Sequence, residues 1–380
     1  MESNTPQTPP VERQDITAEE KIYVASQWQL MWWRFRKHKM AIVGGIILIL
    51  FYIVTLFWEF LAPYDPLRYD VKFAFAKPQL PIFIDRQGFH FPPYVYALKP
   101  RRDPETLAMV FDLDKEKKLP LRFLVHGDKY KFWGIWESDL HLFGLENNEQ
   151  VVFITGADRL GRDQLSRLAA GTRISTTIGL VGVGISLILG ILIGGVSGFY
   201  GGSLDLTIQR VIEFLRSMPT IPLWLALSAA VPDDWPPVRV YFAITVILSL
   251  IGWTGMARTV RGKFLSLREE DFVMAARLVG SSEGRIIVRH MVPSFLSHII
   301  ASVTMAIPGM ILSETSLSFL GLGMRPPAIS WGVLLQEAQN VQTVAMAPWL
   351  MLPGAAVIIS VLAYNFLGDG VRDAADPYAR

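Results

Sequence analysis

Residues 269–280 read EEDFVMAARLVG and residues 290–293 read HMVP, and this is the most informative stretch of the chain. It is polar, basic and helix-forming, yet it lies between two long apolar segments of a hydrophobic chain. A connection that carries regular structure at a membrane surface is typical of an element that meets another protein. The stretch therefore predicts a docking loop between two transmembrane helices.

The composition places this loop in a membrane protein. The chain is 51% hydrophobic and 18% charged, and its mean hydropathy is +0.33. Soluble domains carry about a quarter charged residues. The net charge of +2 is too small to suggest nucleic acid as a partner. The chain contains no cysteine, which excludes disulfides and thiolate metal sites.

Six segments are apolar over the length of about 20 residues that a bilayer requires. They cover residues 40–62, 174–199, 208–231, 239–260, 296–320 and 346–368. The third contains Pro219 and Pro222 in its middle, which helices buried among other helices tolerate. The sequence therefore predicts an all-α polytopic membrane protein with six transmembrane helices.

The segments between these helices divide the chain further. Residues 1–39 are predicted to form a polar tail and an interfacial helix, 40–62 the first transmembrane helix, 63–155 an extracytoplasmic insertion, 156–368 a five-helix core and 369–380 a C-terminal tail. Basic residues in short loops mark the cytoplasmic side. They gather at 34–39 and in the 261–295 loop, whereas 232–238 has none. We therefore expect both termini and the 261–295 loop to be cytoplasmic.

The insertion is expected to be a small β-rich cap. Short runs at 81–84, 122–125 and 130–133 lie between Gly, Pro and Asp breaks and predict strands. Its aromatic residues are expected to pack its core rather than to bind a ligand. These residues are Phe89, Phe91, Tyr94, Tyr96, Phe132, Trp133 and Trp136.

Enzymatic motifs are missing from the sequence. It contains no G-x-x-x-x-G-K-[ST] phosphate-binding loop, so we expect the chain not to hydrolyse ATP itself, to be no enzyme and to hold no cofactor. The six histidines form neither H-E-x-x-H nor a cluster, so a zinc hydrolase is not expected.

Ionisable residues within apolar segments are candidates for a translocation path or gate. Glu314 either lines a polar path or bonds to neighbouring groups, and the structural role is favoured. Arg210, Glu213 and Arg216 are spaced to share one helical face, where mutual neutralisation is favoured over a gate. The charged 158–173 segment and the glycine-rich second span indicate helix assembly.

The 269–293 loop itself predicts two short helices joined at a glycine. Glu270 and Asp271 place negative charge at a helix start, where the helix dipole favours it. Residues 274–278 have high helix propensity, and Gly280 turns the chain. Residues 281–283 are suited to cap a second helix, and Pro293 marks the entry into the next span.

This loop resembles the coupling loop of ABC importer permeases, in which E-A-A, three residues, G, nine residues and I-x-L-P recur. The chain keeps Ala275, Ala276, Gly280 and Pro293 and departs from the pattern at Met274, His290 and Val292. Further motifs at 61–66, 161–163, 171–175, 316–323 and 368–377 resemble the C-type permeases of dipeptide, oligopeptide and nickel importers.

The resemblance implies a subunit of the bacterial or archaeal inner membrane that forms half of a translocation pathway with a B-type permease. It also implies two ATPase subunits that bind ATP and Mg²⁺, and an extracytoplasmic solute-binding protein. The coupling residues would be Glu270, Asp271, Met274, Ala275, Ala276, Gly280 and Pro293. Rigid-body rotation of the helices would then switch access from one side to the other.

Two other classes of membrane protein are the alternatives. A stand-alone secondary transporter would need a complete path, often with internal repeats, and the sequence shows none. A membrane-bound enzyme would need a nucleophile–base or metal set, which is not apparent. Peptides are the expected cargo, with nickel and oligosaccharides as alternatives.

Overall fold

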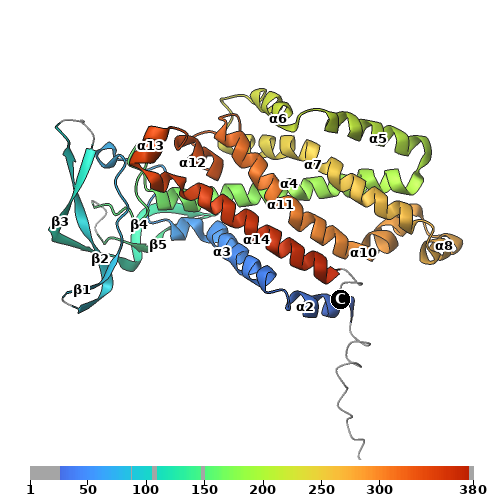
Figure 1. The fold of residues 1–380 in the computed structure, drawn as a ribbon, viewed down its shortest axis with the longest axis horizontal. Coiled ribbons are helices and arrows are strands. Elements are labelled where there is room, and N and C mark those ends of the chain that lie inside the picture. Colours follow the sequence, from blue (N-terminus) through green and yellow to red (C-terminus); the bar gives the residue numbers. More distant parts are fainter. Residues whose placement is uncertain (1–25, 87, 105–108, 147–149, 376–380) are drawn as a thin grey trace, which may run out of the picture.

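The computed structural model describes residues 26–86, 88–104, 109–146 and 150–375. The predicted tail at 1–25 and the last residues, 376–380, lie outside the described residues. Figure 1 shows an elongated molecule in which the strands of the insertion lie at one end and long helices fill the rest. The expected combination of a helical membrane domain with a β-rich insertion is therefore confirmed.

Within the described residues, five helices are long and apolar enough to cross a membrane. They are α3 (Lys39–Leu61), α4 (Gln164–Tyr200), α7 (Pro237–Leu267), α11 (Leu296–Phe319) and α14 (Leu352–Ala375, preceded by the 3-10 turn Pro348–Met351). Three of them exceed the predicted spans, and α7 ends at Leu267 instead of position 260. The helix α4 begins ten residues before position 174, and α14 continues through 369–375, which was predicted as tail.

The third predicted span, 208–231, is wrong as a single helix. It consists of α5 (Gly202–Ser217) and α6 (Thr220–Ala229), which are separated by Met218 in an extended conformation and by Pro219. A proline disfavours the helical conformation of the residue before it, which explains the break at Met218. Figure 1 shows α5 and α6 following one another alongside α7. In place of a sixth long helix, the described residues hold two shorter ones, neither of which is among the five long enough to cross a membrane.

The core of the bundle is built around α4. Its side chain Ile178 packs with Ile244 and Leu248 of α7, Ile311 of α11 and Trp331, and all five are almost completely buried. Glycines of α4 allow the close approach of α7, because a Cβ at Gly198 would lie 2.6 Å from the Cβ of Phe264.

Shorter elements complete the helical part. They are α2 (Gln27–Phe35), the 3-10 turn Val71–Phe73, α8 (Asp271–Leu278), α9 (Glu283–Arg285), the π-helix Ile286–Met291, α10 (Val292–Ser294), α12 (Trp331–Glu337) and α13 (Val341–Met346). The helix α2 begins with a capping box between Ser26 and Gln29 and exposes Trp28 and Trp32, as expected for an interfacial helix.

The insertion contains two antiparallel sheets. One has the order β1 (Ile82–Asp85), β2 (Gly88–Arg102) and β3 (Met109–Pro120), and the other pairs β4 (Arg122–Phe132) with β5 (Trp136–Gly144). The two strands predicted at 122–125 and 130–133 form one strand, β4, interrupted by an irregularity between His126 and Tyr130.

The predicted aromatic core of the insertion is wrong for most of its members. One buried cluster consists of Val95, Leu119, Leu121, Leu145 and Val152, and a second contains Ala76, Phe153 and Ala157. Of the seven aromatic residues, Tyr94 is buried, Tyr96 and Phe132 are partly buried, and Phe89, Phe91, Trp133 and Trp136 are exposed.

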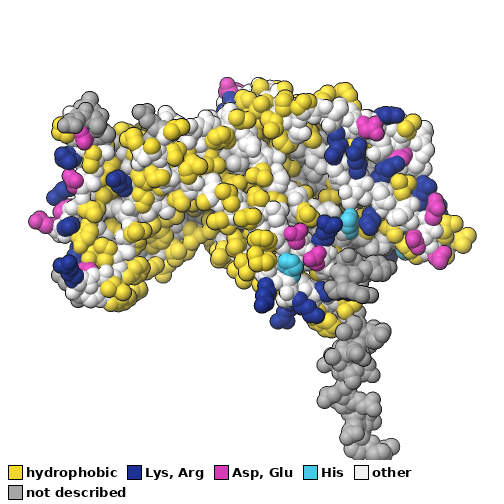
Figure 2. Space-filling model, in the orientation of Figure 1, with side chains coloured by type: hydrophobic (Ala, Val, Ile, Leu, Met, Phe, Trp, Pro, Cys, Tyr) yellow, Lys and Arg dark blue, Asp and Glu magenta, His cyan; other side chains and the backbone are white. Residues whose placement is uncertain are grey.

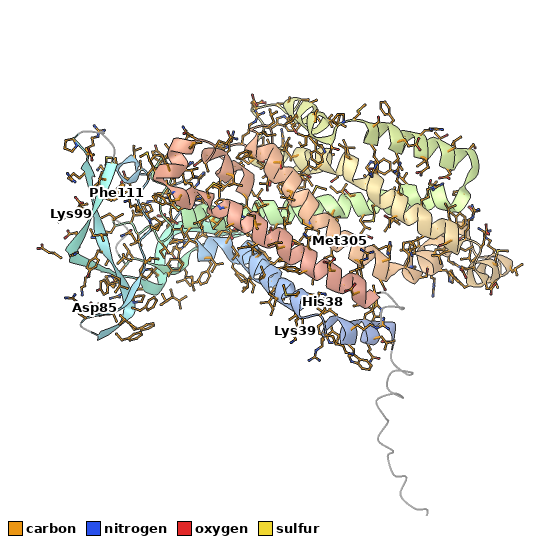
Figure 3. The ribbon with its side chains drawn as sticks, viewed as in Figure 1. His38, Lys39, Asp85, Lys99, Phe111 and Met305 are labelled. Carbon is orange, nitrogen blue, oxygen red and sulfur yellow. The ribbon has the colours of Figure 1, made fainter. Side chains whose placement is uncertain are left out.

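The strands of the insertion and the predicted docking loop lie at opposite ends of the molecule (Figure 1). In Figure 3, Asp85, Lys99 and Phe111 lie on the strands at one end, and His38 and Lys39 lie at the opposite end of α3. The helix α8 also lies far from the strands (Figure 1). The predicted docking loop and the insertion are therefore separated by the length of the helical bundle.

Candidate functional site

The predicted docking loop forms a helix, a tight turn and a second helical segment. The helix α8 is preceded by Glu270 as its N-cap and carries Asp271 in its first turn. The Gly280 amide donates to the Arg277 carbonyl at 2.9 Å, and the Ser281 amide donates to the Ala276 carbonyl at 3.1 Å. With Gly280 at φ 79°, these bonds form a Schellman motif, which ends the helix sharply.

The second segment differs in detail from its prediction. It runs from α9 through the π-helix Ile286–Met291 to α10, where Pro293 lies in the first turn. Ser282 occupies the N-cap position, but its side chain makes no capping hydrogen bond. The predicted pair of short helices joined at Gly280 is therefore present, without the predicted serine cap.

The docking loop is anchored on a buried apolar cluster. Val273 of α8 is fully buried against Phe264 of α7, Ile286 and Met291 of the π-helix, and Phe295. The guanidinium of Arg277 lies 5.1 Å from the ring centroid of Phe199, at the end of α4. The helix α8 is therefore packed against the ends of the long helices rather than suspended on a loose connection.

The opposite side of α8 is exposed and apolar. Leu278 and Val279 expose 87% and 85% of their surface, and Phe272, Met274 and Ala275 are also exposed. We call these five residues the docking face. Glu270 and Asp271 lie at its N-terminal end, so negative charge borders an apolar surface. Ala276 is partly buried against the cluster below.

Arg210 and Glu213 lie on the outer face of α5, whereas Nη1 of Arg216 reaches to 3.8 Å from the position of a Cβ at Gly255 of α7. All three are exposed on α5, and Arg210 pairs with Glu213 at 2.9 Å. The helix α5 is held instead by Ile212, which is buried, and by Asp205, which accepts two hydrogen bonds of 2.6 Å from Arg261 of α7. The Arg210–Glu213 pair agrees with the predicted mutual neutralisation, and Arg216 adjoins a residue of α7 instead.

Glu314 is fully buried in α11 and bonded to neighbouring helices. It accepts hydrogen bonds from Ser318 at 2.7 Å and from Ser175 of α4 at 3.2 Å. Ser175 in turn accepts the backbone amide of Trp331, the first residue of α12. Glu314 therefore links three helices through short polar side chains, which supports its structural alternative.

A cavity of about 450 Å³ opens between α4, α6, α7 and α11, and sequence reasoning did not find it. Its lining is mostly small or polar: Ser186, Gly252, Gly255, Thr259, Ser302, Ala306, Gly309 and Ser313, with Trp224, Met310 and four further apolar side chains. The signal in the sequence is the spacing of small residues at 252, 255 and 259 and at 302, 306, 309 and 313, which places each set on one helical face.

A buried ion cluster joins the start of α4 to α12. Arg162 donates to Asp158 at 2.6 Å and to Glu337 at 2.7 Å, and Arg167 donates to both carboxylates as well. Asp158 and Arg167 are 0% and 1% exposed. The charged 158–173 segment is therefore part of the helix assembly, and its partner Glu337 could not be named from local sequence.

Asp163 begins α4 beside this cluster. Its carboxylate caps the helix by accepting the Ser166 amide at 2.8 Å and the Ser166 hydroxyl at 2.7 Å. Burial raises the pKa of Asp163 to about 6 in spite of these bonds. Its second oxygen, Oδ1, is buried and has no hydrogen-bond partner.

Comparison with known proteins agrees with this architecture. The family of binding-protein-dependent transport system inner membrane components matches residues 187–380, which hold the docking loop and the cavity-lining residues of α7 and α11. The N-terminal transmembrane domain of oligopeptide transport permease C matches residues 26–78.

Named relatives extend the match. The chain is 38% identical over 245 residues to the oligopeptide transport system permease protein OppC of Haemophilus influenzae, covering 64% of this chain and 76% of that protein. It is 31% identical over 355 residues to the dipeptide transport system permease protein DppC of Lactococcus lactis, covering 93% and 91%. The chain therefore belongs to the family of binding-protein-dependent transport system inner membrane components and is an ABC importer permease subunit.

Proposed function

We propose that this chain forms half of a peptide translocation pathway and transmits force from separate ATPase subunits through α8. Relatives named for oligopeptide and dipeptide transport support peptides as the cargo. The observation that carries the mechanical part is the docking face, which is exposed while Val273 beneath it is fully buried. A surface that is apolar outside and rigidly packed inside is suited to transmit movement.

The ATPases would receive the docking face in a groove on the cytoplasmic side. They would bind ATP and Mg²⁺, and this chain would supply no nucleotide-binding group. Closure of the two ATPases would displace α8 together with the ends of α4, α7 and α11, because all of them meet in the cluster around Val273. Glu270 and Asp271 would add charge contacts at the edge of the groove.

The translocation pathway would be completed by a second, B-type permease. The cavity between α4, α6, α7 and α11 would be this chain's share of it, because its small side chains leave room and its hydroxyl groups suit a peptide backbone. A solute-binding protein would deliver the peptide on the side of the insertion, and both termini would be cytoplasmic. Glu314 would hold helices together beside the pathway rather than contact the peptide.

Replacement of a docking-face residue tests the proposal. Leu278→Asp places a charge on the most exposed apolar position of α8, and Val341→Asp is the matched control, since Val341 is 83% exposed on α13. The variants are produced with the subunits encoded beside them, and ATPase co-purification and uptake of labelled tripeptides are measured. We expect Leu278→Asp to lose both while its amount in the membrane is unchanged, and Val341→Asp to retain both. Full uptake by Leu278→Asp would contradict the proposed coupling role.

A further inference from the structure

The β4–β5 hairpin ends in an exposed aromatic tip. We define this tip as Phe132, Trp133, Ile135 and Trp136. Trp133 is 47%, Ile135 67% and Trp136 62% exposed, and the rings of Phe132 and Trp133 stack with centroids 5.4 Å apart. Both family matches, at 26–78 and 187–380, leave the hairpin out. Its apolar end therefore needs an explanation of its own.

The tip is attached to a transmembrane helix. The Trp133 indole N–H donates to the carbonyl oxygen of Leu56 in α3 at 2.8 Å, and the rings of Phe132 and Phe57 lie 6.0 Å apart. Phe57 has a non-helical conformation, so a kink in α3 accompanies this contact. Leu56 lies five residues before the end of α3 at Leu61, which corresponds to about 7.5 Å along the helix.

The hairpin adopts an unfavourable conformation at this contact. Trp133 has φ 52° and precedes Gly134 at φ 73°. A bulky residue rarely adopts the left-handed region, and strain of this kind persists where the surrounding contacts maintain it. At Trp133 the left-handed backbone occurs where the indole bonds to α3, whereas the side chains of Ile135 and Trp136 are exposed.

The surface of α3 continues into the tip. Ile46, Ile49, Ile53 and Leu56 are exposed at helical spacing and form an apolar stripe along α3, which is a membrane-spanning candidate. Because Trp133 bonds to Leu56, the tip adjoins the last residue of this stripe. Figure 2 shows hydrophobic side chains continuing from the helices toward the strands on one face of the molecule.

Charged side chains begin one residue pair away from the turn. Phe132 pairs with Trp136 at the end of the hairpin, and the next pair is Lys131 with Glu137, whose charged groups lie 3.7 Å apart. The side chains of this second pair are 64% and 76% exposed. The change from aromatic to charged residues within one pair is that expected at a boundary between lipid and water.

We infer that the aromatic tip is a membrane anchor that inserts into the bilayer leaflet on the side of the insertion. Tryptophan and phenylalanine are favoured at this depth, since their rings are apolar and the indole N–H can bond to a polar group. Lipid is the partner of the tip for two reasons. The tip continues the apolar surface of a membrane-spanning helix, and charged side chains begin at the next residue pair of the hairpin. The hairpin would thereby fix the insertion against the membrane as well as against α3.

The absence of cysteine allows a direct test by spin labelling. A nitroxide is attached to the full-length chain at Ile135→Cys, in complex with its copurifying subunits, in vesicles of phosphatidylethanolamine and phosphatidylglycerol. The controls are Leu113→Cys on β3 of the same insertion, 54% exposed, and Ile49→Cys on the stripe of α3, 61% exposed. Electron paramagnetic resonance measures collisions with oxygen, which concentrates in lipid, and with a water-soluble nickel complex present on both sides.

We expect the ratio of oxygen to nickel collisions at Ile135→Cys to exceed that at Leu113→Cys about fivefold or more and to approach that at Ile49→Cys. A ratio equal to that at Leu113→Cys would place the tip in water and overturn the inference. Protection from both reagents would show that a protein subunit covers the tip, and this would also overturn it. Peptide uptake by the unlabelled variant verifies that the complex is intact, so failure of the anchor is distinguishable from failure of the proposed transport function.

Discussion

Arg167 and Glu337 lie 170 positions apart in the sequence, yet Nη2 of the arginine is 3.0 Å from Oε1 of the glutamate. The pair joins the first turns of α4 to the end of α12, and Asp158 and Arg162 complete its charge balance. Arg167 is 1% exposed, so its guanidinium depends on these carboxylates for the contacts that water would otherwise provide.

Removing one charge from this cluster should destabilise the protein strongly. Glu337→Gln leaves Arg162 and Arg167 with Asp158 alone, and breaking a buried ion pair costs about 3–5 kcal/mol. Glu213→Gln is the control because it breaks the exposed pair with Arg210, which contributes about 0–1 kcal/mol. Thermal unfolding of the two variants in detergent should show a large loss of Tm for Glu337→Gln alone. Equal Tm values would contradict the structural importance of the cluster.

Asp163 should make stability depend on pH in an unusual direction. Burial raises its pKa from 3.8 to about 6, so the folded state binds more protons than the unfolded state between these values. The contribution of Asp163 to the free energy of unfolding is therefore fully present below about pH 4. About 3 kcal/mol of it is lost as the pH rises through 6.

Asp163→Asn isolates this contribution, because asparagine imitates the protonated carboxyl and can still cap α4. We expect the variant and the original protein to have similar Tm values near pH 4, and the variant to be more stable near pH 7. Parallel curves of Tm against pH would show that Asp163 keeps an ordinary pKa in the folded protein.

Gly280 should be required for the turn that ends α8. A branched side chain at φ 79° costs about 1–2 kcal/mol, so Gly280→Val should loosen the Schellman motif and the docking face with it. Gly284→Ala is the matched control, since a Cβ there meets no atom within 4 Å and φ is not positive. Peptide uptake should fall for Gly280→Val and persist for Gly284→Ala, at equal abundance in the membrane. Unimpaired uptake by Gly280→Val would refute the role of the turn.

Filling the cavity should block the pathway without unfolding the protein. A Cβ at Gly309 meets no atom within 4 Å, and this residue lines the cavity. Gly309→Leu should therefore reduce peptide uptake by about tenfold or more while Tm changes by little, because overpacking costs arise only where atoms already fill the space. Gly184→Leu provides the comparison, since its Cβ is equally unhindered but Gly184 does not line the cavity. Equal uptake by both variants would exclude this cavity from the path.

The sequence predicted the long helices well because the bilayer demands apolar length, and α3 differs from its predicted bounds by one residue at each end. It predicted the turn at Gly280 because glycine tolerates a positive φ. The break at Met218 was missed, although the effect of a following proline on its conformation offered a signal. Pro222 is harmless, since it lies in the first turn of α6, where a missing N–H costs no helical bond.

Two kinds of feature could not be predicted from local patterns. Glu337 as the partner of Arg167 depends on how distant segments pack, and so does the meeting of the small-residue faces of α7 and α11 at one cavity. The aromatic residues of the insertion were predicted to pack its core rather than to bind a ligand. Trp133 and Trp136 are exposed instead, which is unfavourable in water but favourable where lipid is the solvent.

The bond between Trp133 and Leu56 also has a mechanical consequence. It ties the turn of β4–β5 to α3, so we expect a rotation of α3 to carry the strands with it. The outer surface of the insertion would then differ in orientation between the two access states of the permease. Because coupling between two sites is reciprocal, a binding protein that fits one orientation would shift the transmembrane helices toward the matching state.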